Sequence, residues 1–291
     1  MEAGCALCPR KCGVDRTNKR GCCGEGTTVR AARAALHFWE EPCISGEKGS
    51  GTVFFTGCTL GCVFCQNRSI SKDGVGKEIG VSRLVEIFHE LENQGANNLN
   101  LVTPTHFTPQ ILQALSIAKL KIPVVMNTGG YERVETLRLW ENSVDIYLPD
   151  LKYFDPALSA RYSAARDYFP VASAAILEMH RQQPRLVWDG DLLKKGLIVR
   201  HLVLPGCSKD SLRLLDFLDH ALPKENFLLS LMSQYTPTPT CAGFPEINRR
   251  VTTYEYQTVA ERAAELGFQG FLQDRRSAKE EYTPPFDLNG I

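Results

Sequence analysis

The sequence predicts an α/β fold in which helices cover a parallel β-sheet. Short apolar runs rich in β-branched and aromatic residues alternate with longer amphipathic segments along most of the 291 residues. Strands that alternate with helices in this way are typical of parallel sheets with right-handed crossovers. The composition, with 43% apolar and 23% charged residues, is that of an ordinary globular protein with a packed core.

The first half of the chain is expected to supply four strands of this sheet. Residues 31–41 are expected to form a short strand or helix that leads to them. The strands are predicted at 52–55, 99–102, 123–126 and 144–148. Helices are predicted at 81–93 with Ser82 as cap, at 109–120 with Thr108 as cap and proline in first position, and at 133–140.

The second half continues the alternation after a helical insertion. This insertion is expected over 156–183 and is followed by a turn at Asp189-Gly190. Further strands are predicted at 197–204, 227–232 and 268–273, with helices at 210–222 and 253–266. From Arg275 onward the tail is charged, contains prolines and has no periodicity.

Three cysteines follow the first core strand with the spacing C-x3-C-x2-C. They are Cys58, Cys62 and Cys65, within the tract 57–67. A four-iron cluster needs four ligands, so three thiolates would leave one iron open to a small molecule, whereas a structural metal site fills every position. The alternatives are three incidental cysteines, or three of the four ligands of a zinc site.

The tract 57–67, with Phe64 just before its last cysteine, resembles the signature of the radical S-adenosylmethionine (SAM) superfamily. Further phrases at 8–16, 39–46, 102–107 and 198–206 resemble uncharacterised homologues of pyruvate formate-lyase activating enzyme, in the glycyl-radical-enzyme activase branch. The resemblance implies a 4Fe-4S cluster on Cys58, Cys62 and Cys65, with SAM as cosubstrate. It also implies a partial (β/α)6 TIM-like barrel over 46–274, between a cysteine-rich segment 1–45 and a tail 275–291.

Polar residues follow the predicted strands. In barrels of parallel strands the catalytic groups gather at the carboxyl ends of the strands. We therefore expect one mouth to collect the three cysteines and the segments 103–106, 127–131, 149–152, 205–206 and 233–235.

The resemblance assigns roles to some of these residues and departs from the family at others. Most activases have a Gly-Gly-Glu motif after the second strand that holds the amino group of SAM; here Thr103-Pro104-Thr105-His106 stands in its place. Oxygen atoms of Thr103 and Thr105 are candidate acceptors for that group. His106 is expected to be a proton donor, a substrate contact or a neighbour of sulfur, or else a buried histidine that does not contact the ligand.

The following strand ends supply the other expected SAM contacts. Asp150 and Lys152 resemble the Asp-x-Lys of the activases, which contacts the cosubstrate; the alternative is a surface ion pair. Asn127-Thr128 resembles an Asp-Thr pair that helps to hold a monovalent cation in the relatives, but Asn127 carries no charge.

Arg200 resembles the activase arginine that binds the adenosine or the carboxylate. Alternation places His201 on the opposite face. Phe64 is expected to contact the cofactor, and Gln234 or Tyr235 to close the adenosine pocket. Cys207 and Cys241 are expected to be inert buried thiols, or thiols that react with a radical.

Five further cysteines open the chain with the spacing C-x2-C-x3-C-x9-C-C, in a segment rich in glycine and charge. Such a segment cannot bury enough apolar surface to order itself, and metal ligation would supply the missing constraint. We expect a second metal site, either a structural zinc or another iron–sulfur cluster, on Cys5, Cys8, Cys12 and Cys22, with one of the adjacent Cys22 and Cys23 as a spare. The alternative is reduced cysteines in a cap over the barrel.

The charge balance and the hydropathy of the sequence limit the cellular compartments and the classes of partner that we expect. Lysine plus arginine equals aspartate plus glutamate at 33 each, so no nucleic acid partner is expected. The basic residues of the N-terminal segment form a solvated face or dock an acidic partner. No apolar run reaches the roughly 18 to 20 residues of a membrane helix, and no signal peptide is evident. We therefore expect a cytoplasmic protein. Its eleven cysteines cluster at two places, which favours metal ligation over disulfides.

The expected activity is reductive cleavage of SAM to a 5′-deoxyadenosyl radical that abstracts hydrogen. The branch resemblance implies a glycyl-radical enzyme as substrate and an electron donor such as flavodoxin or ferredoxin. One alternative is radical modification of another peptide or of a small molecule. An alternative of a different class is a zinc-binding scaffold or a nucleic-acid-binding protein.

Overall fold

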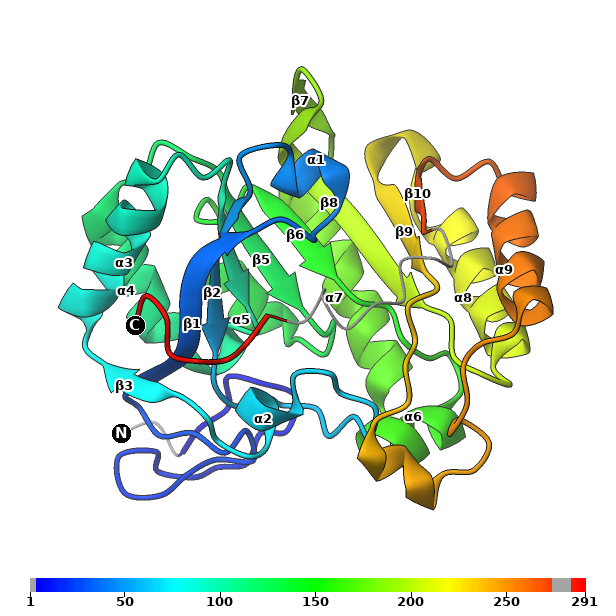
Figure 1. Ribbon diagram of the computed structural model, residues 1–291, viewed down its shortest axis with the longest axis horizontal. Helices are drawn as coiled ribbons and strands as arrows, with labels where there is room; N and C mark the ends of the chain where they lie inside the picture. Colours follow the sequence, from blue (N-terminus) through cyan, green and yellow to red (C-terminus); the bar gives the residue numbers. More distant parts are fainter. Residues whose placement is uncertain (1–3, 274–283) are drawn as a thin grey trace.

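The computed structural model describes residues 4–273 and 284–291. Its sheet has the strand order β10-β9-β8-β6-β5-β4-β2-β1-β3, and the pairs from β2 to β10 are parallel (Figure 1). β1 pairs with β2 and β3 in antiparallel fashion. Because β10 and β3 stand at opposite ends of this order, the sheet is an open, partial barrel, as expected.

The core strands lie where apolar runs predict them, with boundaries shifted by a few residues. Residues 31–41, which were expected to form a strand or a helix, belong mainly to strand β1. The short edge strands β3 and β7 were not predicted. The strands are β1 Val29–His37, β2 Ser50–Phe55, β3 Lys77–Ile79, β4 Leu99–Val102, β5 Val124–Thr128, β6 Ile146–Pro149, β7 Val187–Asp189, β8 Leu192–Leu202, β9 Leu228–Met232 and β10 Gly270–Leu272.

The helices also follow the predicted order, but both predicted caps are wrong. Helix α3 has Gly80 at its N-cap rather than Ser82. Thr108 is the first residue of α4, and its hydroxyl donates to the Thr105 carbonyl at 2.7 Å instead of capping the helix. The helices are α1 Pro42–Ser45, α2 Arg68–Ser71, α3 Val81–Asn93, α4 Thr108–Ala118, α5 Val134–Leu139, α6 Pro156–Ser163, α7 Tyr168–Gln182, α8 Ser208–Ala221 and α9 Thr253–Glu265.

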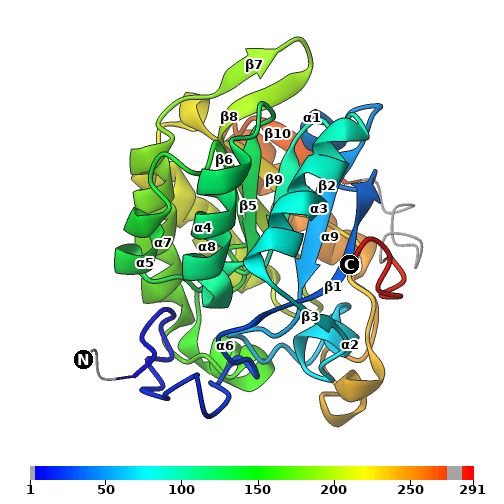
Figure 2. The ribbon, with the colours of Figure 1, turned by 90° about the vertical axis from the view of Figure 1, so that its left-hand side faces the viewer.

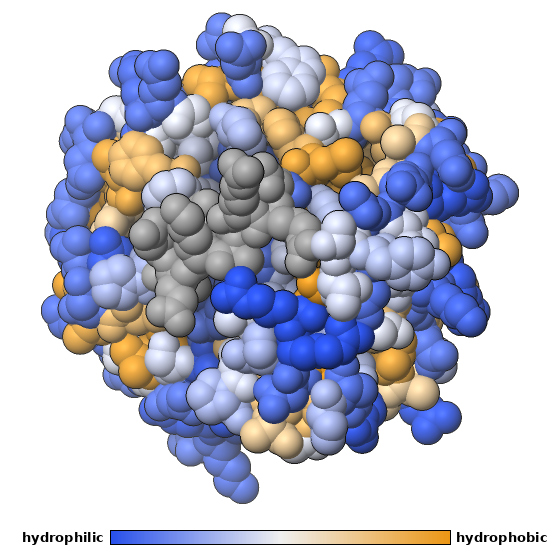
Figure 3. All heavy atoms as spheres, turned by 45° about the vertical axis from the view of Figure 1, so that its right-hand side comes forward, coloured by the Kyte–Doolittle hydropathy of each residue, from blue (hydrophilic) through white to orange (hydrophobic). Residues whose placement is uncertain are grey.

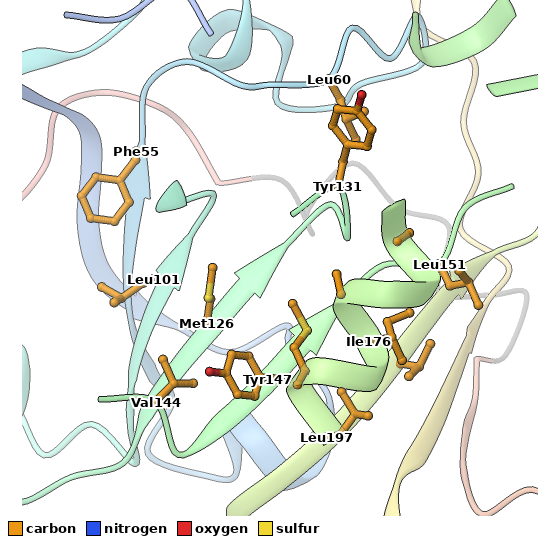
Figure 4. Close-up of a cluster of buried hydrophobic side chains, with 14 of the residues drawn as sticks. Phe55, Leu60, Leu101, Met126, Tyr131, Val144, Tyr147, Leu151, Ile176 and Leu197 are labelled. Carbon is orange, nitrogen blue, oxygen red and sulfur yellow. The ribbon is translucent and has the colours of Figure 1, made fainter. Parts of the chain in front are cut away.

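The outer face of the sheet carries the main apolar core. Leu101, Met126 and Tyr147 come from successive parallel strands and are fully buried with Ile176 of α7 (Figure 4). Each such side chain contributes about 1.5–3 kcal/mol when it leaves water. Since alternate residues of a strand face opposite sides, this packing turns the intervening residues toward the inside of the barrel. Figure 2 shows the helices gathered over this outer side.

The inside of the barrel is apolar at one end and partly polar at the other. Cys43 and Ile44 of α1 pack with Val125, Ile146 and Ile198 in a separate cluster on the inner side of the strands. Farther along the strands, toward their carboxyl ends, polar Asn127 and Arg200 face inward beside apolar Phe54 and Val102. The partly polar end is therefore left for a ligand.

Residues 284–291 lie along β1 (Figure 1). The Ala34 amide donates to the Asn289 carbonyl at 2.9 Å, and the Leu288 amide donates to the Ala32 carbonyl at 3.1 Å. Arg33 pairs with Asp287 at 2.7 Å. The end of the expected aperiodic tail is thus bound to the sheet, while the rest of that tail, 275–283, lies outside the described residues.

In the described part of the chain, no helix is both long and apolar enough to cross a membrane. The face in Figure 3 is largely hydrophilic, with apolar residues scattered among charged ones.

Candidate functional site

The loop with the three cysteines is anchored on both sides. The Cys58 amide donates to the Cys23 carbonyl of the N-terminal segment at 3.1 Å. The amides of Gly61 and Val63 donate to carbonyls at the end of α6, at 3.1 and 2.9 Å. Leu60 belongs to the main core (Figure 4). The thiols therefore occupy fixed positions at the carboxyl end of β2.

Each of the three thiols has a polar neighbour. Ser163 Oγ donates to Cys62 Sγ at 2.9 Å, Ser71 Oγ lies 3.4 Å from Cys65 Sγ, and the Leu60 amide donates to Cys58 Sγ at 3.4 Å. Hydrogen bonds of this kind stabilise thiolates bound to iron.

Cys58, Cys62 and Cys65 fit a cluster better than a single ion. Across residues 4–273 and 284–291, no three His, Cys, Asp or Glu side chains are arranged to share one metal ion. A cubic cluster does not require such convergence, because its three thiolates bind three different irons. All three thiols line the same cavity. The donor set thus suits a 4Fe-4S cluster with one open iron.

This cavity, of about 230 Å³, also collects several of the predicted strand ends. The predicted ligand-binding residues on its walls are Thr103, Asn127, Thr128, Asp150, Lys152 and Arg200. They come from the ends of β4, β5, β6 and from β8, whose carboxyl ends meet at the mouth of a parallel barrel.

Arg200 lies at the centre of a buried ion network. Its Nε donates to Asp150 at 3.1 Å and its Nη1 to Glu40 at 3.2 Å, while Nη2 donates to Asn127. Lys152 also pairs with Asp150. Burial by itself raises the pKa of Asp150, but Lys152 and Arg200 outweigh it and hold that pKa below its usual value.

The alternative of a surface pair for Asp150 and Lys152 is wrong. Their side chains are only 17% and 15% exposed. The network instead forms the polar floor of the cavity.

Glu40 is a cavity residue that the sequence did not reveal. The segment after β1 carries it into the barrel, where its carboxylate accepts from Asn100 at 3.0 Å and from Asn127 at 3.2 Å. Burial raises the pKa of Glu40, and Arg200 opposes this shift. The neighbouring His37 and Trp39 also line the cavity. In the sequence, the signal was limited to two adjacent glutamates before a proline.

Thr103 lies at the cavity, whereas Thr105 is turned away from it. Thr103 has a φ of 58°, an uncommon conformation for a residue with a side chain, and its amide donates to the Asn127 carbonyl at 2.8 Å. The Thr105 hydroxyl donates to the Glu132 carboxylate at 2.7 Å, and Thr128 donates to the same group. Thr105 and Glu132 are both buried.

The structure places His106 outside the walls of the cavity. Its Nε2 lies 2.7 Å from the Thr56 carbonyl, and the ring is buried. Burial lowers the pKa of His106 to about 4, so the ring is neutral near pH 7. His201 is likewise buried, on the opposite face as expected, between the Leu151 carbonyl and Ser211.

The residues after β9 also lie away from the cavity walls. Gln234 accepts from Gln273 at 3.3 Å. Tyr235 packs edge-on against Phe64 at 5.7 Å and donates to the Ile247 carbonyl at 2.8 Å. Cys207 and Cys241 are buried, and burial raises the pKa of Cys207 to about 12, which favours the inert thiol. Cys5, Cys8, Cys12 and Cys22 lie in the N-terminal segment, outside the cavity walls.

The buried Glu132 predicts a measurable pH dependence of stability. Burial raises the pKa of Glu132 to about 7, from an ordinary value of 4.5, although Thr128 and Thr105 oppose the shift. The folded state then binds the proton more tightly than the unfolded state. The contribution of protonated Glu132 to the free energy of unfolding is therefore complete below pH 4.5 and is lost as the pH rises to about 7.

Glu132→Gln keeps the neutral shape, and the threonine hydroxyls can rotate to suit it. We expect urea unfolding to give equal stability for wild type and variant near pH 4.5, and a variant about 3 kcal/mol more stable at pH 8. A stability difference that does not change with pH would contradict the shift.

Comparison with known proteins places the chain in a family. Residues 52–197 match the model of the radical SAM superfamily. Uncharacterized protein MJ0674 of Methanocaldococcus jannaschii is 31% identical over 271 residues, which cover 89% of this chain and 74% of that protein.

Solved structures show the same fold. SuiB of Streptococcus suis bound to SAM has 13% identity, a TM-score of 0.52, and coverage of 79% of this chain and 51% of SuiB. A radical SAM methyltransferase from Sphaerobacter thermophilus has 14% identity, a TM-score of 0.52, and coverage of 77% and 66%. The chain thus spans between about half and two thirds of the length of these enzymes. Together with the matched family model, the cysteine loop and the open parallel barrel show that this chain belongs to the radical SAM superfamily.

Proposed function

We propose that this protein cleaves SAM reductively and uses the 5′-deoxyadenosyl radical to remove a hydrogen atom from a substrate. The observation that supports this most directly is the single cavity that joins Cys58, Cys62 and Cys65 to the polar ends of β4, β5 and β6. When bound, a 4Fe-4S cluster would supply one electron to SAM, which divides into methionine and the radical. The radical takes a hydrogen atom from the substrate, giving 5′-deoxyadenosine and a substrate radical. The electron comes from a one-electron donor such as flavodoxin or ferredoxin.

The chain's own residues would hold and orient SAM. Lys152 has further N–H groups besides the one directed at Asp150, and it can bind the carboxylate of SAM. The guanidinium of Arg200 is already shared among Asp150, Glu40 and Asn127. We therefore assign Arg200 to the positioning of these acceptors rather than to a free fork for the ligand.

The other end of the amino acid part of SAM needs acceptors. Asp150 is ionised, because its pKa lies below the usual value. It and the oxygen atoms of Thr103 are the candidates for the ammonium group that the Gly-Gly-Glu motif would otherwise hold. Both residues line the cavity with the thiols.

For the substrate, we propose a glycine α-carbon in an extended peptide segment of a partner, as in the glycyl-radical-enzyme activases that the chain resembles. The support comes from the phrases shared with that branch, and SuiB, which has the same fold, was solved with its precursor peptide SuiA. A second candidate is a small polar molecule. The observation that favours it is that His37, Trp39 and Pro284 of the chain itself also line the cavity.

Deuterium transfer separates these two substrates. Cells that carry the native gene are grown with α-deuterated glycine, and their extract is divided by ultrafiltration into macromolecules and small molecules. Each fraction is incubated anaerobically with the reconstituted enzyme, SAM and reduced flavodoxin, and 5′-deoxyadenosine is analysed by mass spectrometry.

The peptide proposal predicts deuterated 5′-deoxyadenosine from the macromolecular fraction, and no such transfer if that fraction is first treated with protease. Turnover that depends on the small-molecule fraction alone would contradict it and favour the small substrate. SAM that remains intact with both fractions and with dithionite would contradict the radical function itself.

A further inference from the structure

The N-terminal segment that carries five of the cysteines lies beside the cluster loop, at the same end of the sheet (Figure 1). Cys12 has both Cys5 and Cys22 as close neighbours. Cys8 and Cys23 are electrostatic neighbours of each other, and both are neighbours of Cys5. Cysteines as far apart in sequence as Cys5 and Cys23 are thus brought into one group.

Short turns present these thiols. Residues 4–28 contain neither helix nor strand. In the first turn, the Lys11 amide donates to the Cys8 carbonyl and the Gly13 amide to the Cys5 carbonyl, both at 3.0 Å. In the second, the Gly24 amide donates to the Gly21 carbonyl at 2.9 Å. Two turns that each present cysteines to a shared site are typical of thiolate metal sites.

Cys23, rather than the adjacent Cys22, belongs to the inner group. Cys23 is buried and Cys22 is exposed. A Cβ atom placed on Gly21 would lie 3.4 Å from Cys12 Sγ and 3.5 Å from Cys23 Sγ, so both sulfurs face the same part of the backbone. Cys8, like Cys23, is only 6% exposed. The structure therefore favours Cys23 as the fourth thiol, in place of Cys22, which the sequence analysis had suggested.

The same turn holds the cluster loop. The Cys23 carbonyl accepts from the Cys58 amide at 3.1 Å, and Arg10 Nε donates to the Thr59 carbonyl at 2.9 Å. Gly57, with a φ of 87°, allows this approach, because a Cβ atom there would lie 2.7 Å from the Cys23 carbonyl oxygen. Whatever fixes Cys23 thus also fixes the start of the cluster loop.

We propose that Cys5, Cys8, Cys12 and Cys23 ligate a second metal centre, a zinc ion or an iron–sulfur cluster, which holds the N-terminal segment against the cluster loop. Four thiolates suit either of these soft-metal centres. The described side chains do not yet converge on a single ion. The same is true of Cys58, Cys62 and Cys65, for which the family implies a cluster, so the lack of convergence weighs against a single zinc ion and not against an iron–sulfur cluster.

Metal analysis on a chain that lacks the first site tests this proposal. The triple variant Cys58→Ala/Cys62→Ala/Cys65→Ala is purified anaerobically from cells supplied with iron and zinc, and its iron, zinc and sulfide are measured. We expect about one zinc per chain, or about four irons with equal sulfide. In this background, Cys8→Ser and Cys23→Ser should each lower that metal content at least about tenfold, as expected for loss of a ligand. Cys22→Ser and Cys43→Ser are the matched controls and should leave it unchanged.

A second measurement does not depend on these variants being folded. Native mass spectrometry of the wild-type holoenzyme should show the mass of one 4Fe-4S cluster plus the additional zinc or cluster. A wild-type mass with one cluster and nothing more would overturn the proposal. Retention of the metal by Cys23→Ser together with its loss in Cys22→Ser would overturn the proposed ligand set. Neither readout involves SAM cleavage, so failure of the radical function leaves this test intact.

Discussion

Replacing Cys62 with alanine is expected to abolish formation of 5′-deoxyadenosine from SAM. The Cys62 thiol lines the cavity with Cys58 and Cys65. Three of the four irons of the cluster each need one thiolate, and the variant has only two. Changes outside a ligand sphere already cost 10–100-fold, so loss of a ligand should lower the rate by at least about 100-fold. The product is measured by liquid chromatography after anaerobic reconstitution and reduction with dithionite.

The matched control is Cys207→Ala, which removes a buried thiol that packs in the main core away from the cavity walls. This variant should retain turnover and the iron content of the wild type. Equal turnover by Cys62→Ala and wild type would show that the loop does not carry the reactive cluster.

Replacing Arg200 with methionine is expected to destabilise the fold by about 3–5 kcal/mol. The guanidinium is the shared partner of Glu40, at 3.2 Å, and Asp150, at 3.1 Å. Without Arg200, Glu40 loses its ion-pair partner. Asp150 loses one of its two ion-pair partners and keeps Lys152. A buried charge without its partner costs far more than an exposed one. Urea unfolding under reducing conditions measures the loss.

A double-mutant cycle identifies the cause of this loss. Adding Glu40→Gln to Arg200→Met should recover part of the stability, because the double variant removes one of the uncompensated carboxylates. Arg83→Met is the control, since Arg83 pairs with Glu90 at the surface and should cost no more than about 1 kcal/mol. An Arg200→Met variant as stable as this control would contradict the buried network.

Much of the fold could be predicted because its strands are short apolar runs separated by longer helical patterns. β4 is buried at every position, and its apolar run is visible without knowledge of its neighbours. β7 is exposed at every position, so its sequence carries no burial pattern. The predicted cap of α4 failed for a local reason, since the Thr108 hydroxyl donates to the Thr105 carbonyl, three residues earlier in the chain.

Some residues of the site could be predicted from a local sequence pattern, and others could not. Cys58, Cys62 and Cys65 are close in sequence, and their spacing alone indicates a cluster. Glu40 reaches the cavity from a distant segment, and no local pattern reports that. Thr105 and His106 follow β4, as mouth residues should. A short 3-10 turn over Thr105–Phe107 directs their side chains to Glu132 and to the Thr56 carbonyl instead.

Membership of the radical SAM superfamily indicates an enzyme and replaces the alternative of a zinc scaffold or nucleic-acid-binding protein. The family implies a 4Fe-4S cluster and SAM. The chain departs from the activase pattern at Thr103 and Asn127, both on the cavity wall. The differences from that branch therefore concern how the ligand is held.

Electron paramagnetic resonance of the reduced protein, recorded with and without SAM, tests the central claim most directly. If SAM binds at the open iron of a cluster on Cys58, Cys62 and Cys65, the spectrum of the reduced cluster should change when SAM is added. The change should persist in the Cys23→Ser variant, provided that variant retains the first cluster, and disappear in Cys62→Ala. A reduced wild-type spectrum that is identical with and without SAM would contradict the assignment of this cavity as a radical SAM site.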